Sequence, residues 1–424
     1  MTKNRRSVHC ALACALFIVF LGYSLQSLSP IRLSSDVVTY LQMARSAAEG
    51  HGIPREYRHA YYPAGYPALI AGLLKLHVAH PWTLIALNVL WLMLAAAACW
   101  VLFRRSFQFG GVTSGLLMLA WLVSWIVFKH AAMPLSDSAF LGALMAALVS
   151  MNAGCEASSP RQAAWLGALA ALFTAVSVSF RTAGLALLPA LFVTNLRYWR
   201  RSRNDPRWRL PAASMTLAVL AGLAVGLPLM GIYSFSVYSG QALHKPATAL
   251  ERVFFRAWEM GGLALNLPPT IHARFLPRVV THAVGIFFAL LVAAGFWVRR
   301  RFQAEDLFML CYSALLVQWP YYDERFLLPV VPFMAAYVWM VARTVETRML
   351  RIAMAGYLVV FIANGVFSLS YSIWLGSLRG ARFAQTYGGG SERNNYCAAF
   401  GDCPIDPSRP PANPAYVDVL RFYR

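Results

Sequence analysis

Charged residues are scarce in this sequence. Only 13% of the 424 residues are Asp, Glu, Lys or Arg, whereas 59% are apolar. A soluble globular protein carries about 25% charged residues, most of them on its surface. This composition therefore excludes a soluble domain, and we expect a protein that crosses a membrane several times.

Acids are especially few, at 17 against 37 Lys and Arg, which gives a formal net charge of +20. Such an excess is compatible with nucleic acid, with anionic lipid or with membrane topology. The basic residues stand in short clusters between apolar runs, and no recognisable nucleic-acid-binding motif accompanies them. We expect membrane lipid as a partner and no nucleic acid.

Long apolar runs follow one another along the chain. We predict an all-α bundle of about eleven transmembrane spans, because roughly 20 apolar residues cross the hydrocarbon core. The predicted spans are 9–28, 82–103, 111–128, 138–153, 162–179, 182–196, 211–233, 280–297, 304–319, 326–342 and 351–374. The first is expected to be retained, because no small-residue cleavage site follows it.

Clustered arginines predict the orientation. With the N-terminus in the cytoplasm, the chain returns inside at four basic stretches, 103–105, 197–209, 299–301 and 343–351. Short basic loops are typical of the cytoplasmic side. The loops at about 30–80 and 234–279 then lie outside, and amphipathic patterns in both predict helices at the membrane interface.

The last residues differ from the rest in composition. We predict a transmembrane domain at 1–376 and a small loop-rich outer tail at 377–424, which is rich in Gly and Pro. Cys397 and Cys403 lie in this tail. A disulfide between them suits an oxidising compartment, and zinc is disfavoured because no His lies nearby. The sequence leaves open whether they pair.

Two acids stand at predicted outer helix starts. Asp36 precedes Tyr40 by one helical turn in "SSDVVTYLQMAR", and Asp137 lies in "PLSDSAF" between the third and fourth spans. Asp is a favoured helix N-cap, so capping is one explanation for both residues. The other is catalysis, with Asp36 as a general base that takes a proton from an attacking group.

Cations and aromatic rings are mixed in "EYRHAYYPAGYP". An aromatic belt at the headgroups accounts for Tyr61 and Tyr62, but it does not predict Arg58 and His59 beside them. Cations suit a phosphate group and aromatic faces suit a sugar ring. We predict a phosphate-binding role for Arg58 and a sugar-binding or lipid-binding role for His59, Tyr61 and Tyr62.

Two further arginines are candidates for phosphate binding. Arg181 lies at the junction of two apolar spans, where it snorkels to the headgroups, pairs with an acid or meets an anion. Arg325 follows Asp323 and Glu324 at the outer mouth of the tenth span. It either binds phosphate or is neutralised by these two acids.

Taken in order, four motifs resemble the membrane glycosyltransferases of the GT-C superfamily, in the branch of protein O-mannosyltransferases and the lipid A aminoarabinose transferase. Three are the stretches "YPAGYPAL" at 62–69, "SFRTAGLALLP" at 179–189 and "RFLLPVVP" at 325–332. The first motif consists of Asp36, Tyr40, Ala44, Arg45, Glu49, Gly50 and Gly52. The order and the predicted topology match over nearly the whole chain up to the tail.

This resemblance implies an inverting glycosyltransferase of a bacterial inner membrane. Its donor is a sugar on a polyprenyl phosphate, its acceptor is a glycan, a glycolipid or a protein, and its active site lies on the periplasmic face with Asp36 as base. With Asp137 from the turn between the third and fourth spans and Arg256 from the second outer loop, the predicted site residues are Asp36 and Asp137 for catalysis, Arg58, Arg181, Arg256 and Arg325 for the donor phosphate, and Tyr40, His59, Tyr61 and Tyr62 for sugar or lipid.

No cofactor is implied by the resemblance. Many relatives carry an acidic pair at the first motif, whereas Asp36 is followed here by Val37. We therefore expect no metal ion bridged by paired acids, although a divalent metal is compatible with the superfamily.

A different class of function remains as the alternative. A transporter or flippase, or a non-catalytic protein that handles lipid-linked saccharides, has the same overall composition. A secondary transporter needs ionisable residues near the middle of the membrane. The predicted spans hold almost none, which favours the transferase.

Overall fold

Helices make up all the regular structure in the part of the chain that the structure describes. It is a computed structural model that describes residues 2–26, 30–52, 62–230, 249–268, 274–319, 322–344, 347–387, 392–401 and 403–423. The predicted all-α class is confirmed.

A helix lies at each predicted span. In chain order these are α1 (Thr2–Leu25), α5 (Pro81–Val101), α6 (Gly111–Leu122) with α7 (Trp125–Ala131), α8 (Ser136–Glu156), α9 (Pro160–Phe180), α10 (Leu188–Asn204), α11 (Arg209–Met230), α15 (Arg278–Arg299), α16 (Ala304–Gln318), α17 (Val331–Thr344) and α18 (Arg348–Ser377). Among the described residues, five helices are long and apolar enough to cross a membrane, or six with α6 and α7 taken as one bent span. A multi-pass protein is thereby supported, and the larger number of spans stays a prediction.

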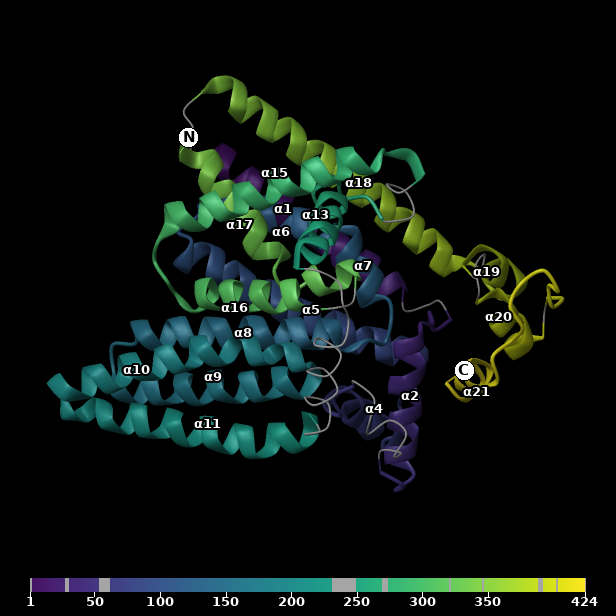
Figure 1. Cartoon of the computed structure of the whole chain (residues 1–424), viewed down its shortest axis with the longest axis horizontal. Helices are drawn as coiled ribbons and strands as arrows, with labels where there is room; N and C mark the ends of the chain where they lie inside the picture. Colours follow the sequence, from purple (N-terminus) through teal and green to yellow (C-terminus); the bar gives the residue numbers. More distant parts are fainter. Residues whose placement is uncertain are drawn as a thin grey trace.

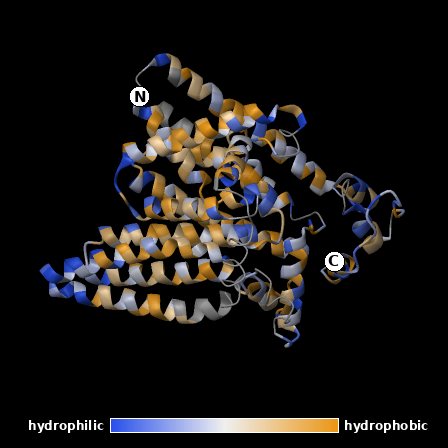
Figure 2. Cartoon of the chain, viewed as in Figure 1, coloured by the Kyte–Doolittle hydropathy of each residue, from blue (hydrophilic) through white to orange (hydrophobic). Residues whose placement is uncertain are grey.

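The spans form a bundle with the other helices at one end. Figure 1 shows α8, α9, α10 and α11 running alongside one another. In Figure 2 these helices are apolar along their length and hydrophilic where α10 meets α11, which is the basic stretch at 197–209. The predicted outer loops contribute α2 (Ser35–Ala48), α4 (Gly65–Lys75) and α13 (Ala249–Leu265).

The tail holds three short helices, α19 (Gly380–Tyr387), α20 (Arg393–Phe400) and α21 (Pro414–Phe422). They lie beyond the end of α18, on the side of the molecule where α2 is found (Figure 1). Cys397 and Cys403 form a disulfide.

One predicted span is broken. α6 and α7 meet at an angle of 60°, which leaves backbone groups without their helical partners. The side chain of Asn266 replaces one of the missing partners, because its Oδ1 accepts a hydrogen bond from Trp125 N at 2.9 Å. Its Nδ2 donates to Phe361 O at 2.9 Å, so the break is tied to α18 as well.

A buried charge network closes the opposite end of the bundle. Arg299, the last residue of α15, pairs with Glu305 and, at 2.6 Å, with Asp306 at the start of α16. Tyr337 of α17 donates a hydrogen bond to Asp306 at 2.5 Å, and Asn152 of α8 donates to Glu305 at 2.6 Å. Because all three charged residues are buried, their pairing holds four helices together.

We predict that Arg299→Met destabilises the protein by about 3 to 5 kcal/mol, because it leaves two buried carboxylates without their cation. Thermal unfolding in detergent measures the effect, with Arg105→Met, at an exposed arginine near the same end, as the matched control. Equal melting temperatures for the two variants would contradict a structural role for the network.

Candidate functional site

Asp36 lies in the first turn of α2 but does not cap it. The N-cap is Ser34, whose hydroxyl accepts a hydrogen bond from Val37 N at 3.3 Å. The explanation of Asp36 as a helix cap is therefore wrong. Its carboxylate points to residues from elsewhere in the chain.

Two side chains hold the Asp36 carboxylate. Tyr62, shortly before α4, donates its hydroxyl to Oδ1 at 2.6 Å, and Arg325 pairs with Oδ2 at 2.5 Å. Arg325 belongs to the short helix η5 (Glu324–Leu327), which Asp323 caps. Asp323 also pairs with Arg325 at 3.1 Å, so this arginine has one of its neighbouring acids and Asp36 as partners.

Asp137 makes the second acid–arginine pair. It lies in the first turn of α8, where no side chain caps the helix, and it pairs with Arg181 just after α9. The side chains are 3% and 16% exposed. The structure thus shows a buried ion pair where capping and snorkelling were the alternatives. Asp137 Oδ2 has no hydrogen-bond partner among the described residues.

The two pairs are neighbours. The guanidinium groups of Arg181 and Arg325 lie 5.5 Å and 5.2 Å from the centre of the Phe326 ring. Asp137 is also close enough to Arg325 for their charges to interact. We call Asp36, Asp137, Arg181 and Arg325 the two-pair site. It brings together the predicted acids with two of the predicted phosphate-binding arginines.

Tyrosine rings line the approach to the Asp36 pair. Tyr40 contacts Tyr62 and Tyr66 edge to face, with centroids 5.2 Å and 5.7 Å apart. Burial, followed by the charge of Asp36, raises the pKa of Tyr62 above its usual value, and burial raises the pKa of Tyr40 to about 12. Both phenols are therefore neutral at physiological pH, and Tyr62 acts as a hydrogen-bond donor.

Arg256 is buried in a separate contact. It pairs with Glu259 of α13 at 2.5 Å and donates to Leu316 O at 3.0 Å, which fastens α13 to α16. Its predicted binding to a donor phosphate stays a prediction. Three other predicted residues lie outside the described residues: Arg58, His59 and Tyr61.

Sequence reasoning missed two buried polar residues near the site. Asn88 accepts a hydrogen bond from Tyr66 at 2.8 Å. His130 is buried within reach of the charge of Asp137, and its Nδ1 lies 2.7 Å from Ile126 O. Both interrupt apolar runs, Asn88 alone in "LIALNVLW" and His130 beside Lys129 in "WIVFKHAAM", and a polar residue in such a run is a usable signal.

Among the residues that the structure describes, no group of three or more His, Cys, Asp and Glu is placed to hold a metal ion. The arginines instead supply the positive charge that both carboxylates of the two-pair site need.

Comparison with known proteins finds solved structures with a similar fold. No family model and no curated protein matches the sequence. Among solved structures, ArnT from Cupriavidus metallidurans in the apo state is similar over 100% of this chain and 75% of that chain, with a TM-score of 0.53 and 14% identity. The same protein bound to undecaprenyl phosphate gives 0.48 over 91% and 80%, also at 14% identity. The chain shares the fold of ArnT.

We predict strong coupling within the Asp137–Arg181 pair. Arg181→Met leaves a buried carboxylate uncompensated and costs about 3 to 5 kcal/mol of stability, whereas Asp137→Asn with Arg181→Met costs less than Arg181→Met alone. Thermal unfolding of the wild type, both single variants and the double variant gives the interaction free energy of the pair. Additive effects would show that the two side chains do not act as a pair.

Proposed function

We propose that this chain is a membrane glycosyltransferase that moves a sugar from a polyprenyl-phosphate donor to an acceptor on the outer face of the membrane. One observation carries the proposal: Asp36, the acid of the first motif, lies in a part-buried site beside two arginines and a second carboxylate. The fold shared with ArnT, a lipid A aminoarabinose transferase, supports the same reading.

Asp36 is the proposed base. An acceptor hydroxyl or amine gives its proton to the carboxylate while its oxygen or nitrogen attacks the anomeric carbon of the donor. The bond from that carbon to the phosphate oxygen breaks, and both bonding electrons leave with the polyprenyl phosphate. Attack on the face opposite the leaving group inverts the anomeric configuration.

Arg325 and Arg181 are the proposed phosphate ligands. A guanidinium binds phosphate in the same bidentate fashion as carboxylate, so a bound donor competes with the acids for both cations. As Arg325 turns to the phosphate, its hold on Asp36 weakens. Donor binding thereby frees the base at the moment that it is needed, and the arginines stabilise the departing charge.

The remaining side chains of the site suit a sugar. The rings of Tyr40 and Tyr62 lie beside the carboxylate, and the Tyr62 hydroxyl already donates to it; aromatic rings and polar side chains together suit a sugar. The acceptor is a glycan, glycolipid or protein of the bacterial envelope, and the protein resides in the inner membrane with its N-terminus in the cytoplasm.

We expect Asp36→Asn to lower transfer by about 100- to 10,000-fold, because the amide cannot take up the proton. A strain lacking the gene is complemented with the wild type or the variant at equal membrane levels, and its envelope glycolipids, glycans and glycoproteins are profiled by mass. A species that gains the mass of one sugar only with the wild type names the acceptor.

The matched control is Asp205→Asn, at a carboxylate in the basic loop between α10 and α11 whose described partner is Arg207. It should restore the mass as fully as the wild type. If Asp36→Asn does so too, Asp36 is not the base.

A further inference from the structure

The tail contacts the chain just before the helix that carries Asp36. Tyr396 of α20 is fully buried, and its hydroxyl donates a hydrogen bond to Ile31 O at 2.8 Å. The same hydroxyl accepts a hydrogen bond from Leu33 N at 3.0 Å. One phenol thus satisfies two backbone groups in the three residues at 31–33, which lead directly into α2.

Further along α2, the tail contacts the helix itself. Tyr423 donates to Leu41 O at 2.8 Å, and this bond is buried. Asp418 of α21 pairs with Arg45 at 3.0 Å, while the Arg45 guanidinium lies 4.2 Å from the centre of the Phe422 ring. The contacts therefore run from the residues before α2 to its last turn.

The opposite side of the same segment is fixed to the bundle. Arg32 donates through Nη1 to Ser372 Oγ and through Nη2 to Ser372 O, both at 2.8 Å. Ser372 belongs to α18. Residues 31–33 are thus held between a transmembrane helix and the tail, and Asp36 follows three residues later.

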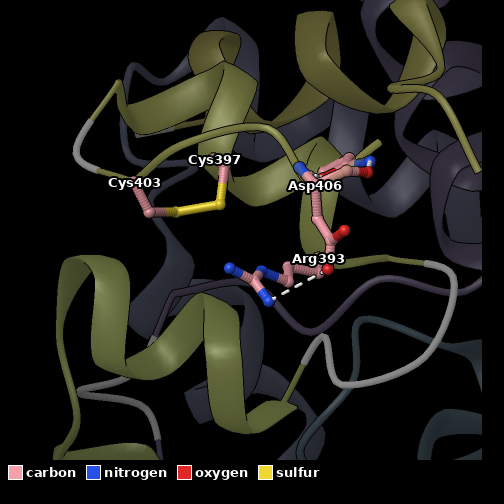
Figure 3. Close-up of a disulfide and its surroundings, with 5 residues drawn as sticks. Arg393, Cys397, Cys403 and Asp406 are labelled. Carbon is pink, nitrogen blue, oxygen red and sulfur yellow. Dashed lines mark hydrogen bonds and ion pairs between the residues drawn. A yellow bond between two sulfur atoms is a disulfide. The ribbon is translucent and has the colours of Figure 1, made fainter. Parts of the chain in front are cut away.

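A disulfide gives the tail its own rigidity. Cys397 of α20 is bonded to Cys403, which closes a short loop directly after Tyr396 (Figure 3). Nearby, Arg393 pairs with Asp406 at 3.3 Å, and Asn394 donates to Asp406 O at 2.9 Å. A helix of eight residues has little stability alone, so these cross-links maintain the position of the Tyr396 hydroxyl.

We propose that the tail helices α19, α20 and α21, with the disulfide that follows Tyr396, form a positioning module for α2, and that Tyr396 is the positioning residue that fixes where Asp36 stands. Its effect on transfer rests on the function proposed above, whereas its effect on α2 does not. Asp36 must meet both Tyr62 and Arg325, and a displacement of about 1 Å in an active site is enough to cost about 100-fold in rate. Because the disulfide constrains the loop directly after Tyr396, reduction should loosen α2.

Hydrogen exchange on the full-length protein in detergent tests the positioning without any substrate. We expect Tyr396→Phe, and separately Cys397→Ser with Cys403→Ser, to speed exchange of the amides at 31–41 relative to the wild type, with α9 and α11 unchanged. The matched control is Tyr371→Phe, at an exposed tyrosine of α18. Wild-type exchange at 31–41 in the Tyr396→Phe variant would overturn the proposal.

Kinetics then separate this inference from the proposed function. With the acceptor found by mass profiling, Tyr396→Phe should lower kcat about 10- to 100-fold and change KM for the donor less than kcat, because Arg181 and Arg325, the proposed phosphate ligands, lie on other elements than α2. A wild-type kcat alongside faster exchange would overturn the link to Asp36. If the wild type transfers no sugar to any envelope species, the proposed function fails and the exchange rates still decide the positioning.

Discussion

The rest of the site depends on the ion pair between Asp36 and Arg325. It joins α2, near the start of the chain, to the short helix η5, and it lies beside a second pair of the same kind. Two carboxylates at close quarters repel each other unless cations lie between them. The arginines compensate the charge of both acids in a part-buried site, and any ligand that draws an arginine away leaves its acid without that partner.

Charge is distributed in the same way at the other end of the bundle. There Arg299 neutralises part of the charge of Glu305 and Asp306 within a network that also includes a tyrosine and an asparagine. The carboxylates of the two clusters differ in whether their oxygens all have hydrogen-bond partners among the described residues. Glu305 and Asp306 are held by several donors at once, whereas Asp137 Oδ2 has no hydrogen-bond partner among the described residues. Because this oxygen can still accept a hydrogen bond, the two-pair site is the cluster suited to bind a ligand.

Hydropathy predicted the helices well because the length and apolarity of a span are local properties. The same local signals singled out Asp36, Asp137, Arg181 and Arg325 one by one, but they did not predict which acid meets which arginine, since pairing depends on how the helices pack. The cap of α2 shows the limit on a smaller scale: Ser34 and Asp36 have equivalent capping chemistry, and only the structure shows that Ser34 takes the role. Asn88 and His130 escaped notice because their importance comes from neighbours distant in sequence.

The break between α6 and α7 has a consequence for how the chain is made. The amide of Trp125 obtains its partner from Asn266, and Asn266 in turn bonds to Phe361. A ribosome synthesises the chain from its N-terminus, so the bent span enters the bilayer long before either of these residues exists. Unpaired backbone groups are costly in hydrocarbon. Until the later helices arrive, the nascent span must therefore stay a straight helix, or water or a chaperone must satisfy its backbone groups. The bend is therefore among the last features of the fold to be completed.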